Sequence, residues 1–144
     1  MLAENLARYV VTGTEEYVGE LVRSGLPENE ARENAATVMA NSFPDGVPAN
    51  GNEVFDVCAG DEIVGLLWLG PASAGTWYVM DFEIRKEFRR RGYGRETMLL
   101  AERVALGHGA SHLGLNVFGH KPNARALYES LGYETQAVRM RKRL

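Results

Sequence analysis

The segment from residue 76 to residue 107 constrains the fold of this chain most, because a strand pattern, a glycine-rich turn and a helix pattern follow one another there. TWYVMDFEIR, residues 76–85, is rich in aromatic and β-branched side chains, which favours a strand. RRRGYGRETM, which begins at Arg89, leads from this strand into a helix that we expect from Arg95 to Leu106. A helix in this position packs back onto the sheet to bury its apolar face, so the segment predicts a sheet covered by helix.

The rest of the chain predicts more helices before this segment and more strands on both sides of it. Helical patterns begin with Thr14 as an N-cap and restart near Pro27, and only LARYVVTG, short and ambiguous, could serve as an earlier strand. We expect helices over residues 14–25, 26–43 and 121–132, a loop over 43–53, and strands over 53–60, 63–70, 111–119 and 133–144. Because strands alternate with helices in the second half, the pattern predicts an α+β fold, a mixed sheet flanked by helices, in a single domain of residues 1–144.

Composition excludes several classes of protein. Cys58 is the only cysteine, which excludes an internal disulfide framework or a multi-cysteine zinc site, and its alternating apolar surroundings predict a buried thiol. No run approaches the roughly 18 apolar residues of a membrane span, and the N-terminus lacks a signal-peptide layout. We therefore expect a cytoplasmic protein with no membrane partner. The three histidines show no metal-ligand spacing, and we expect no metal.

The net charge of −3 conceals an uneven distribution of charge. Residues 1–63 hold twelve acidic and three basic side chains, whereas residues 64–144 hold seven acidic and thirteen basic ones. Such a chain can present two differently charged walls to one ligand, an acidic wall for a cationic amine and a basic wall for an anion. Two solvated faces of opposite sign explain the same counts equally well.

The glycine-rich turn is a candidate anion site for a main-chain reason. The first N–H groups of a helix have no partner within the helix, and the helix dipole places partial positive charge at that end. Gly92 and Gly94 lack Cβ atoms, so a phosphate oxygen can approach their main chain closely. Basic side chains add charge-assisted donors to the same place, namely Arg85, Lys86, Arg89, Arg90, Arg91 and Arg95.

Three other interpretations of this turn compete with a phosphate site. RRRGYGRE lacks the Lys-Ser/Thr ending of a P-loop and the third glycine of a dinucleotide-binding loop, so both nucleotide motifs fit poorly. A run of arginines suits nucleic acid, but the pI of about 5.6 argues against a broad basic footprint, and we expect no nucleic-acid partner. A solvated turn remains an equal alternative from this stretch alone.

A second segment favours the phosphate interpretation. LGLNVFGHKPNARALYESLGYE follows the R-x-x-G-x-G of Arg89–Gly94, and this ordered pair, over residues 53–144, resembles the GNAT superfamily of N-acetyltransferases. GLPENEAR followed by FPDG is similar to the helical start of some bacterial members. The resemblance implies a mostly antiparallel twisted sheet, acetyl-CoA as co-substrate, and direct transfer of an acetyl group to a primary amine of a small molecule or peptide. The alternative is a non-catalytic acyl-CoA-binding or regulatory module of the same fold.

The resemblance also implies roles for individual residues. The turn matches the pyrophosphate loop of the family at Arg89, Arg90, Arg91, Gly92, Tyr93, Gly94 and Arg95. Phe82, Glu83 and Ile84 match the end of the strand whose backbone pairs with the pantetheine arm. Tyr128 matches the tyrosine that protonates the departing thiolate. The family usually has an asparagine where this chain has Lys121, and Asn123 is the nearby amide that we include in the predicted cofactor site.

The chemistry requires a base as well as an acid. An ammonium group with a pKa near 10.4 must lose its proton before it attacks a thioester, and a carboxylate can take that proton. Asp81 and Glu83 alternate on one strand, so both side chains point to the same face of the sheet, and we predict Glu83 as the base. Ordinary polar positions on a sheet face, and a core aromatic at Tyr128, are the structural alternatives. The basic segment 133–144 either pairs across a homodimer or forms a solvated edge.

Overall fold

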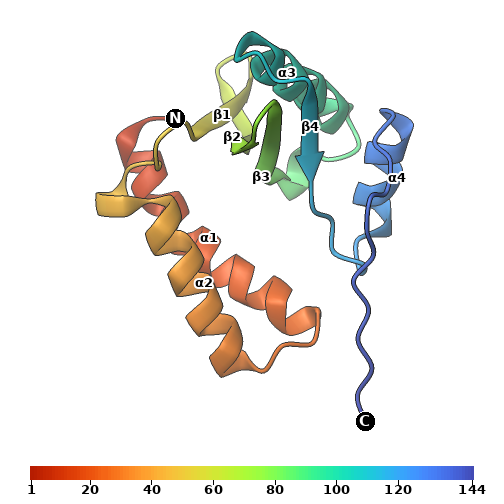
Figure 1. Cartoon of the computed structure of the whole chain (residues 1–144). Helices are drawn as coiled ribbons and strands as arrows, with labels where there is room; N and C mark the ends of the chain where they lie inside the picture. The colour runs from red at the N-terminus through yellow and green to blue at the C-terminus, as the bar shows by residue number, and fades with distance from the viewer.

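The computed structural model describes residues 1–144 and has the four helices and four strands labelled in Figure 1. The elements are α1 (Ala3–Arg23), α2 (Glu28–Ser42), β1 (Glu53–Ala59), β2 (Glu62–Ser73), β3 (Thr76–Ile84), α3 (Tyr93–Gly107), β4 (His112–Leu115) and α4 (Pro122–Ser130). Two single 3₁₀ turns, Pro44–Gly46 and Lys86–Phe88, lie in the loops before β1 and after β3.

The strands form one mixed sheet in the order β1-β2-β3-β4. β1 pairs with β2 and β2 with β3 in antiparallel fashion, whereas β3 and β4 run parallel. The prediction of an α+β fold with a mixed, mostly antiparallel sheet flanked by helices is therefore confirmed. The parallel pair exists because α3 carries the chain from the end of β3 back to the start of β4 across one face of the sheet.

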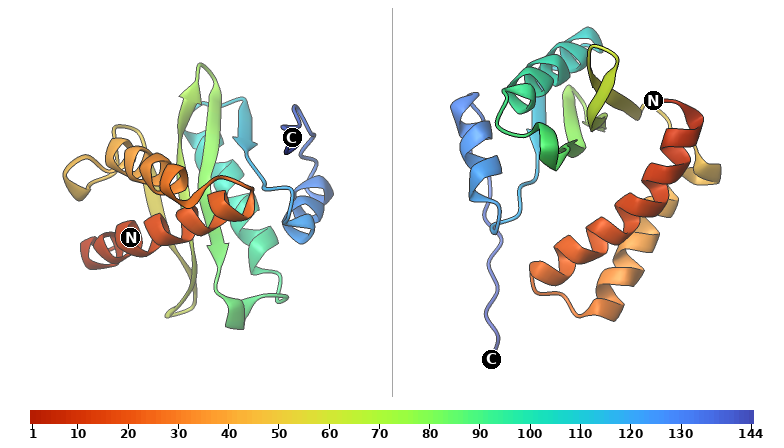
Figure 2. Two further views of the ribbon diagram at one scale, coloured as in Figure 1. Left: turned by 90° about the horizontal axis from the view of Figure 1, so that it is seen from below. Right: turned by 180° about the vertical axis from the view of Figure 1, so that it is seen from behind.

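Helices cover both faces of this sheet (Figure 2). Leu67 and Leu69 of β2 point to α3, whereas Trp68 between them points to α1, as the period of two in a strand requires. The core on the α3 face consists of Leu67, Leu69, Trp77, Val79, Met98, Ala101, Ala105 and Ala110. The core on the α1 face consists of Leu6, Tyr9, Met39, Phe43, Val54 and Trp68. The sheet is thus the middle layer of three.

The first helix begins earlier than the sequence predicts. α1 starts at Ala3, so LARYVVTG is helical rather than a first strand. Thr14 is not an N-cap but lies within the helix, where its hydroxyl donates to the carbonyl of Val10 at 2.6 Å. Leu6, Tyr9 and Gly13 follow a helical period and are buried, and this tertiary contact outweighs the poor helix propensity of the valines, threonines and glycine.

The predicted closing strand over 133–144 is wrong, because these residues have no secondary structure and extend beyond α4 as a single segment (Figure 1). The guanidinium of Arg141 in this segment donates to the carbonyl of Gly25, between α1 and α2. The alternating pattern of residues 133–144 suits a strand, but β4 offers only four residues for pairing. All but Tyr133 are exposed, and the last six residues carry four cationic side chains that are better solvated than packed side by side.

The strand predicted over 111–119 is much shorter than expected, since β4 ends at Leu115. Cys58 was predicted to be buried and is exposed. The register of β1 shifts between Val57 and Cys58, near the free end of the β1–β2 hairpin. This shift changes the alternation at the end of β1 that predicted a buried thiol.

Candidate active site

The site begins where β3 and β4 separate. Their pairing ends at Val79 and Leu115, whereas β3 continues to Ile84 without a neighbour on that side. The main-chain N–H of Arg85 donates to β2 at 2.9 Å. In an antiparallel pair alternate residues bond to the partner, so the main-chain groups of Phe82 and Ile84 point away from β2, toward the opening between the strands. The opening therefore presents the polar edge of a strand.

Part of this strand edge is already used within the chain. The N–H of Phe82 donates to the carboxylate of Asp81 at 2.8 Å. The carbonyl of Ile84 accepts from Nε of Arg89 at 2.7 Å, and the same guanidinium lies 3.5 Å from the carboxylate of Glu83. Arg89 therefore fastens the start of the glycine-rich turn to the end of β3 rather than projecting into solvent.

The turn itself exposes a row of main-chain donors. Arg90 and Gly92 have φ angles of 65° and 87°, in the left-handed region, and this geometry brings successive N–H groups to one side. The first N–H with an acceptor in α3 belongs to Glu96, which bonds to the carbonyl of Gly92 at 3.1 Å, and α3 has no side-chain N-cap. The main-chain N–H groups of residues 90–95 donate to no atom of the chain. This is the arrangement that binds anions in proteins.

Gly94 fixes the position of this turn against the sheet. A Cβ atom at Gly94 would lie 3.3 Å from Cδ2 of Leu127 on α4 and 3.8 Å from the ring of Phe82 on β3. The absence of a side chain thus allows the first turn of α3 to sit between β3 and α4. As a result the row of N–H donors lies beside the opening between the two parallel strands.

The other predicted cofactor-binding side chains lie in the turn and on α4. Arg91 stacks over the ring of Phe88, with its guanidinium carbon 5.6 Å from the ring centre. Arg90 and Arg95 are exposed and have no carboxylate within 4.0 Å, so their charges are available to a ligand. Asn123 is exposed in the first turn of α4 and makes no hydrogen bond within the chain.

The two candidate bases both face α1, as their alternation predicts, but their surroundings differ. Asp81 is fully engaged, because one carboxylate oxygen accepts from the hydroxyl of Tyr9 at 2.7 Å and the other from the N–H of Phe82. Glu83 has only its long contact with Arg89. Burial, together with the charges of Glu16 and Asp81, raises the pKa of Glu83 above the ordinary value for glutamate. Glu83 is therefore the carboxylate with fewer hydrogen bonds within the chain.

Tyr128 lies on α4 in the apolar cluster between the sheet and α3. Its ring contacts that of Tyr133 edge-on, with 6.0 Å between the ring centres. Burial raises the pKa of the Tyr128 hydroxyl, and the charge of Asp81 raises it further. The phenol thus keeps its proton at neutral pH and is an available proton donor, with no hydrogen-bond partner inside the chain.

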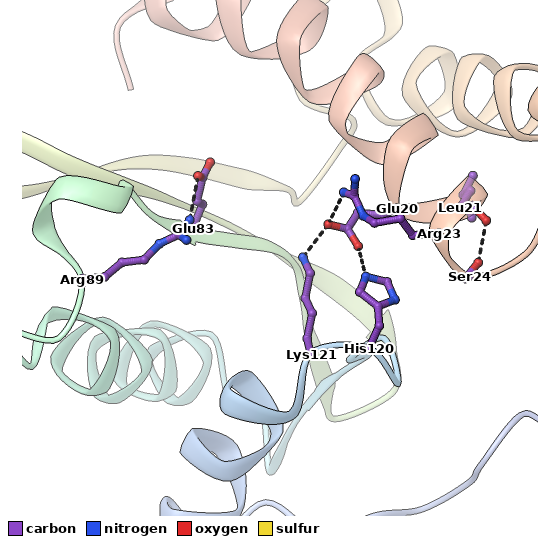
Figure 3. A network of polar contacts seen from close by, with 8 residues as sticks. All are labelled: Glu20, Leu21, Arg23, Ser24, Glu83, Arg89, His120 and Lys121. Atoms are coloured by element: carbon purple, nitrogen blue, oxygen red, sulfur yellow. Dashed lines mark hydrogen bonds and ion pairs between the residues drawn. The ribbon is translucent and has the colours of Figure 1, made fainter.

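A side-chain bridge that the sequence did not predict joins α1 to the loop between β4 and α4 (Figure 3). Glu20 of α1 lies 2.8 Å from Nζ of Lys121 and 2.6 Å from Nε2 of His120, and Arg23 adds a third contact at 2.9 Å. Although burial acts in the opposite direction, these hydrogen bonds lower the pKa of Glu20 to about 2. Lys121, where the family usually has an asparagine, is thus paired with the acidic helix.

A cavity of about 160 Å³ lies between the first half of α1 and the sheet. Glu83 forms part of its wall and is therefore accessible from the α1 face as well as lying close to the strand opening. The complete lining consists of Met1, Asn5, Arg8, Tyr9, Thr12, Asp56, Ile63, Gly65, Leu66, Glu83 and Arg85. A ligand in this cavity reaches the carboxylate from the side opposite the core of α3.

No group of three or more His, Cys, Asp or Glu side chains is arranged to hold a metal ion. No helix is both long enough and apolar enough to cross a bilayer. The arrangement combines a turn with free main-chain N–H groups, an open strand edge, a carboxylate with a raised pKa and a protonated phenol. Together with the three-layer fold, these features are those of an acyltransferase.

Comparison with known proteins supports this class. The model of the Acetyltransferase (GNAT) family matches residues 17–133, so the chain belongs to that family. The chain is 28% identical over 150 residues to an uncharacterized N-acetyltransferase of Bacillus subtilis, YycN, and the match covers 100% of this chain and 96% of the relative. A second uncharacterized N-acetyltransferase of the same organism, YdgE, is 28% identical over 123 residues, which cover 81% of this chain and 77% of YdgE.

Solved structures share the fold. The crystal structure of YycN superimposes with a TM-score of 0.90 at 29% identity, over 100% of this chain and 95% of that one. A Bacillus subtilis acetyltransferase solved in complex with CoA matches with a TM-score of 0.61 at 20% identity, over 71% of this chain and 64% of that chain. The predicted resemblance to the GNAT family is confirmed.

Proposed function

We propose that this protein transfers an acetyl group from acetyl-CoA to a primary amine by direct attack of the amine within a ternary complex. The observation that carries the proposal is the row of main-chain N–H groups of residues 90–95 beside the opening between β3 and β4, with Glu83 on the adjoining strand. The similarity to N-acetyltransferases and to a protein solved with CoA supports acetyl-CoA as the co-substrate.

The turn and the strand edge divide the binding of CoA between them. The N–H groups of residues 90–95 bind the pyrophosphate, and Gly92, Tyr93 and Gly94 contribute main chain without obstructing it. The free carbonyl of Phe82 and the free N–H of Ile84 pair with the amide groups of the pantetheine arm. Arg90, Arg91 and Arg95 flank the phosphates, whereas Arg89 holds the turn against β3. Asn123 lies at the rim of the same opening.

Glu83 acts as the general base. Its raised pKa brings it closer to neutrality than an ordinary glutamate, which improves proton removal from an ammonium group whose unperturbed pKa is about 10.4. Asp81 is excluded from this role because both of its oxygens already accept hydrogen bonds. Its role is to fix Tyr9, and with it α1, over the acceptor side of the sheet.

Tyr128 acts as the general acid. When the amine has attacked the thioester carbonyl, the bond from that carbon to sulfur breaks and the sulfur leaves with the electron pair. The buried phenol of Tyr128 gives its proton to this thiolate and regains one from solvent afterwards. No covalent link to the protein is needed for this reaction.

Substitution of Tyr128 by Phe tests the proposal. The variant keeps the ring that packs in the cluster but loses the hydroxyl, so we expect kcat to fall by about 10²-fold. The affinity for CoA, measured by isothermal titration calorimetry, remains as in the parent protein. A panel of primary amines with acetyl-CoA, read by release of free thiol, supplies the activity. Bound CoA without turnover of any amine would contradict the proposal and indicate a non-catalytic acyl-CoA-binding protein.

A further inference from the structure

We propose that the acetyl acceptor is an amine that also carries a carboxylate, and that Arg8 and Arg85 bind this carboxylate. The inference rests on the proposed function and names the class of acceptor. It comes from the cavity beside Glu83, whose wall holds charges of both signs, carboxylates from β1 and β3 and guanidinium groups from α1 and the end of β3. A purely cationic acceptor needs only the carboxylates.

The two guanidinium groups of this cavity are free to bind a ligand. Neither Arg8 nor Arg85 has a carboxylate within 4.0 Å, although Asp56 and Glu83 line the same cavity. Some surface arginines of the protein are paired in this way, namely Arg23 with Glu20, Arg32 with Glu15 and Glu28, and Arg125 with Glu129, whereas Arg8 and Arg85, like Arg90 and Arg95, are not. An arginine without a partner beside a cavity is suited to a carboxylate, because its planar donors match the two oxygens.

The two carboxylates of the cavity wall differ in their hydrogen bonds within the chain. Asp56 accepts a hydrogen bond from the side-chain amide of Asn5 at 3.2 Å, so that carboxylate is already oriented by α1. Glu83 is the carboxylate that remains for an amine. The acceptor is therefore oriented with its amine toward Glu83 and its carboxylate toward the outer rim, where Arg8 and Arg85 are exposed.

The size and position of the cavity restrict the acceptor further. About 160 Å³ is less than the roughly 300 Å³ at which pockets for drug-sized ligands begin, so a small aliphatic amino acid or the end of a peptide fits better than a bulky amine. The cavity is lined by the first half of α1, whereas the Glu20–Lys121 bridge ties the last part of α1 to the β4–α4 loop (Figure 3). Because this bridge joins the last part of α1 to that loop, we infer that the acceptor reaches Glu83 through the cavity lined by Arg8 and Arg85.

Matched acceptors and variants test this inference. A series of unbranched ω-amino acids is compared with the corresponding ω-amino amides, using acetyl-CoA and thiol release. We expect kcat/KM to be about tenfold or more higher for the best amino acid than for its amide, the effect of one charge-assisted pair. Arg8→Met and Arg85→Met should each remove most of this preference for the amino acid over its amide. Arg103→Met, exposed on α3 across the sheet, is the control and should change neither rate.

Equal or faster turnover of the amides would overturn the inference while leaving acetyl transfer intact. An equal fall in kcat/KM for the amino acid and for its amide in the arginine variants would also overturn the inference. Calorimetry of the amino acid against the CoA-saturated protein separates the two proposals, since it needs no turnover. Binding that depends on Arg8 and Arg85 without any acetylation would uphold the carboxylate site and contradict the proposed function. Absence of both binding and turnover for every amino acid contradicts the carboxylate site itself.

Discussion

The two sides of the site are built in opposite ways. On the proposed cofactor side, the candidate binding groups are main-chain atoms of one continuous stretch, residues 90–95, beside the edge of β3. On the proposed acceptor side, the candidate groups are side chains from elements far apart in the sequence, Arg8 of α1 and Glu83 of β3, and contacts such as Tyr9 with Asp81 hold these elements together. In the proposed site, main-chain N–H groups held in one loop conformation bind the cofactor, and charged side chains bind the acceptor. Substitutions that change the main-chain conformation of the loop should therefore weaken CoA binding, and substitutions that remove a charge should lower turnover of the acceptor.

The largest effect is expected at Glu83. Glu83→Gln keeps the shape of the side chain but removes the base, so kcat should fall by about 10²- to 10³-fold. The affinity for CoA should stay within a factor of about two, since the strand edge is main chain. Glu87→Gln is the control, because Glu87 is exposed in the 3₁₀ turn just beyond β3 and makes no ion pair. A variant at Glu83 that loses CoA and keeps its kcat would reverse the division between the two sides.

The pH dependence of kcat/KM in Glu83→Gln and Glu87→Gln tests the same role of Glu83. The ionised form of Glu83 is the active one, so kcat/KM rises with pH through the pKa of that carboxyl group. Because burial and the charges of Glu16 and Asp81 raise that pKa, the rise should lie above the ordinary value of 4.5. The rise should be absent in Glu83→Gln and unchanged in Glu87→Gln. A rise that persists in Glu83→Gln would assign it to another group.

A smaller effect is expected at Gly92. An alanine there must adopt a left-handed φ of 87°, which costs about 1 kcal/mol and turns the N–H groups of the loop. Gly92→Ala should weaken CoA binding by about tenfold. Gly60→Ala is a matched control, because Gly60 has a φ of 63° in the β1–β2 turn and, like Gly92, has no atom near the position of a Cβ. Both variants should lose similar thermal stability, and an equal loss of CoA affinity in both would remove the loop from the site.

A substitution at Arg90 distinguishes the contribution of the main-chain N–H groups of the loop to CoA binding from that of its charged side chains. Its φ of 65° is one that an L-residue adopts with strain, so Arg90→Gly should not lower the melting temperature. If main-chain N–H groups carry most of the binding, CoA affinity should fall by only about two- to threefold. A loss of about a hundredfold in titration calorimetry would show that the arginine side chains, rather than the main chain, bind the phosphates.

The smallest effect is a change in stability at the Glu20 bridge. Glu20→Gln should lower the free energy of unfolding by about 1–2 kcal/mol at pH 7, through the loss of charge-assisted hydrogen bonds. The folded-state pKa of about 2 lies below the ordinary value of 4.5, so the contribution is complete above pH 4.5 and disappears as the pH falls toward 2. Urea unfolding at several pH values measures this. Glu33→Gln, exposed on α2, should show no such dependence, and a pH-independent difference for Glu20→Gln would exclude the ion pairs as its cause.

The local structure of the proposed cofactor side could be predicted from the sequence, because its pattern lies within one stretch. A strand pattern, two glycines and a helix pattern lie within one stretch, and α3 begins at Tyr93, two residues before the expected start. The position of Gly94 against Leu127 is known only from the structure. Local periodicity failed for residues 133–144, whose alternation suits a strand that has too short a partner in β4, and for residues 116–119, where the predicted strand had already ended.

The acceptor side could not be predicted to the same degree. The alternation of Asp81 and Glu83 places both on one face, but only the contact with Tyr9, 72 residues away, shows which carboxylate is engaged. The pairing of Glu20 with His120 spans 100 residues and has no local pattern. A helix that begins at Ala3 rather than Thr14 brings Arg8 to the cavity, and this depends on burial against the sheet, which the sequence of α1 alone does not reveal.

The most direct test of the division between the two sides is an amide-resolved NMR titration of the ¹⁵N-labelled protein with CoA and, separately, with pantetheine. Pantetheine contains the arm that pairs with β3 but lacks the pyrophosphate. The N–H signals of residues 90–95 should shift strongly with CoA and hardly at all with pantetheine, while the N–H of Ile84 should shift with both. Binding of CoA that leaves the signals of residues 90–95 unmoved would contradict the assignment of this turn as the pyrophosphate site.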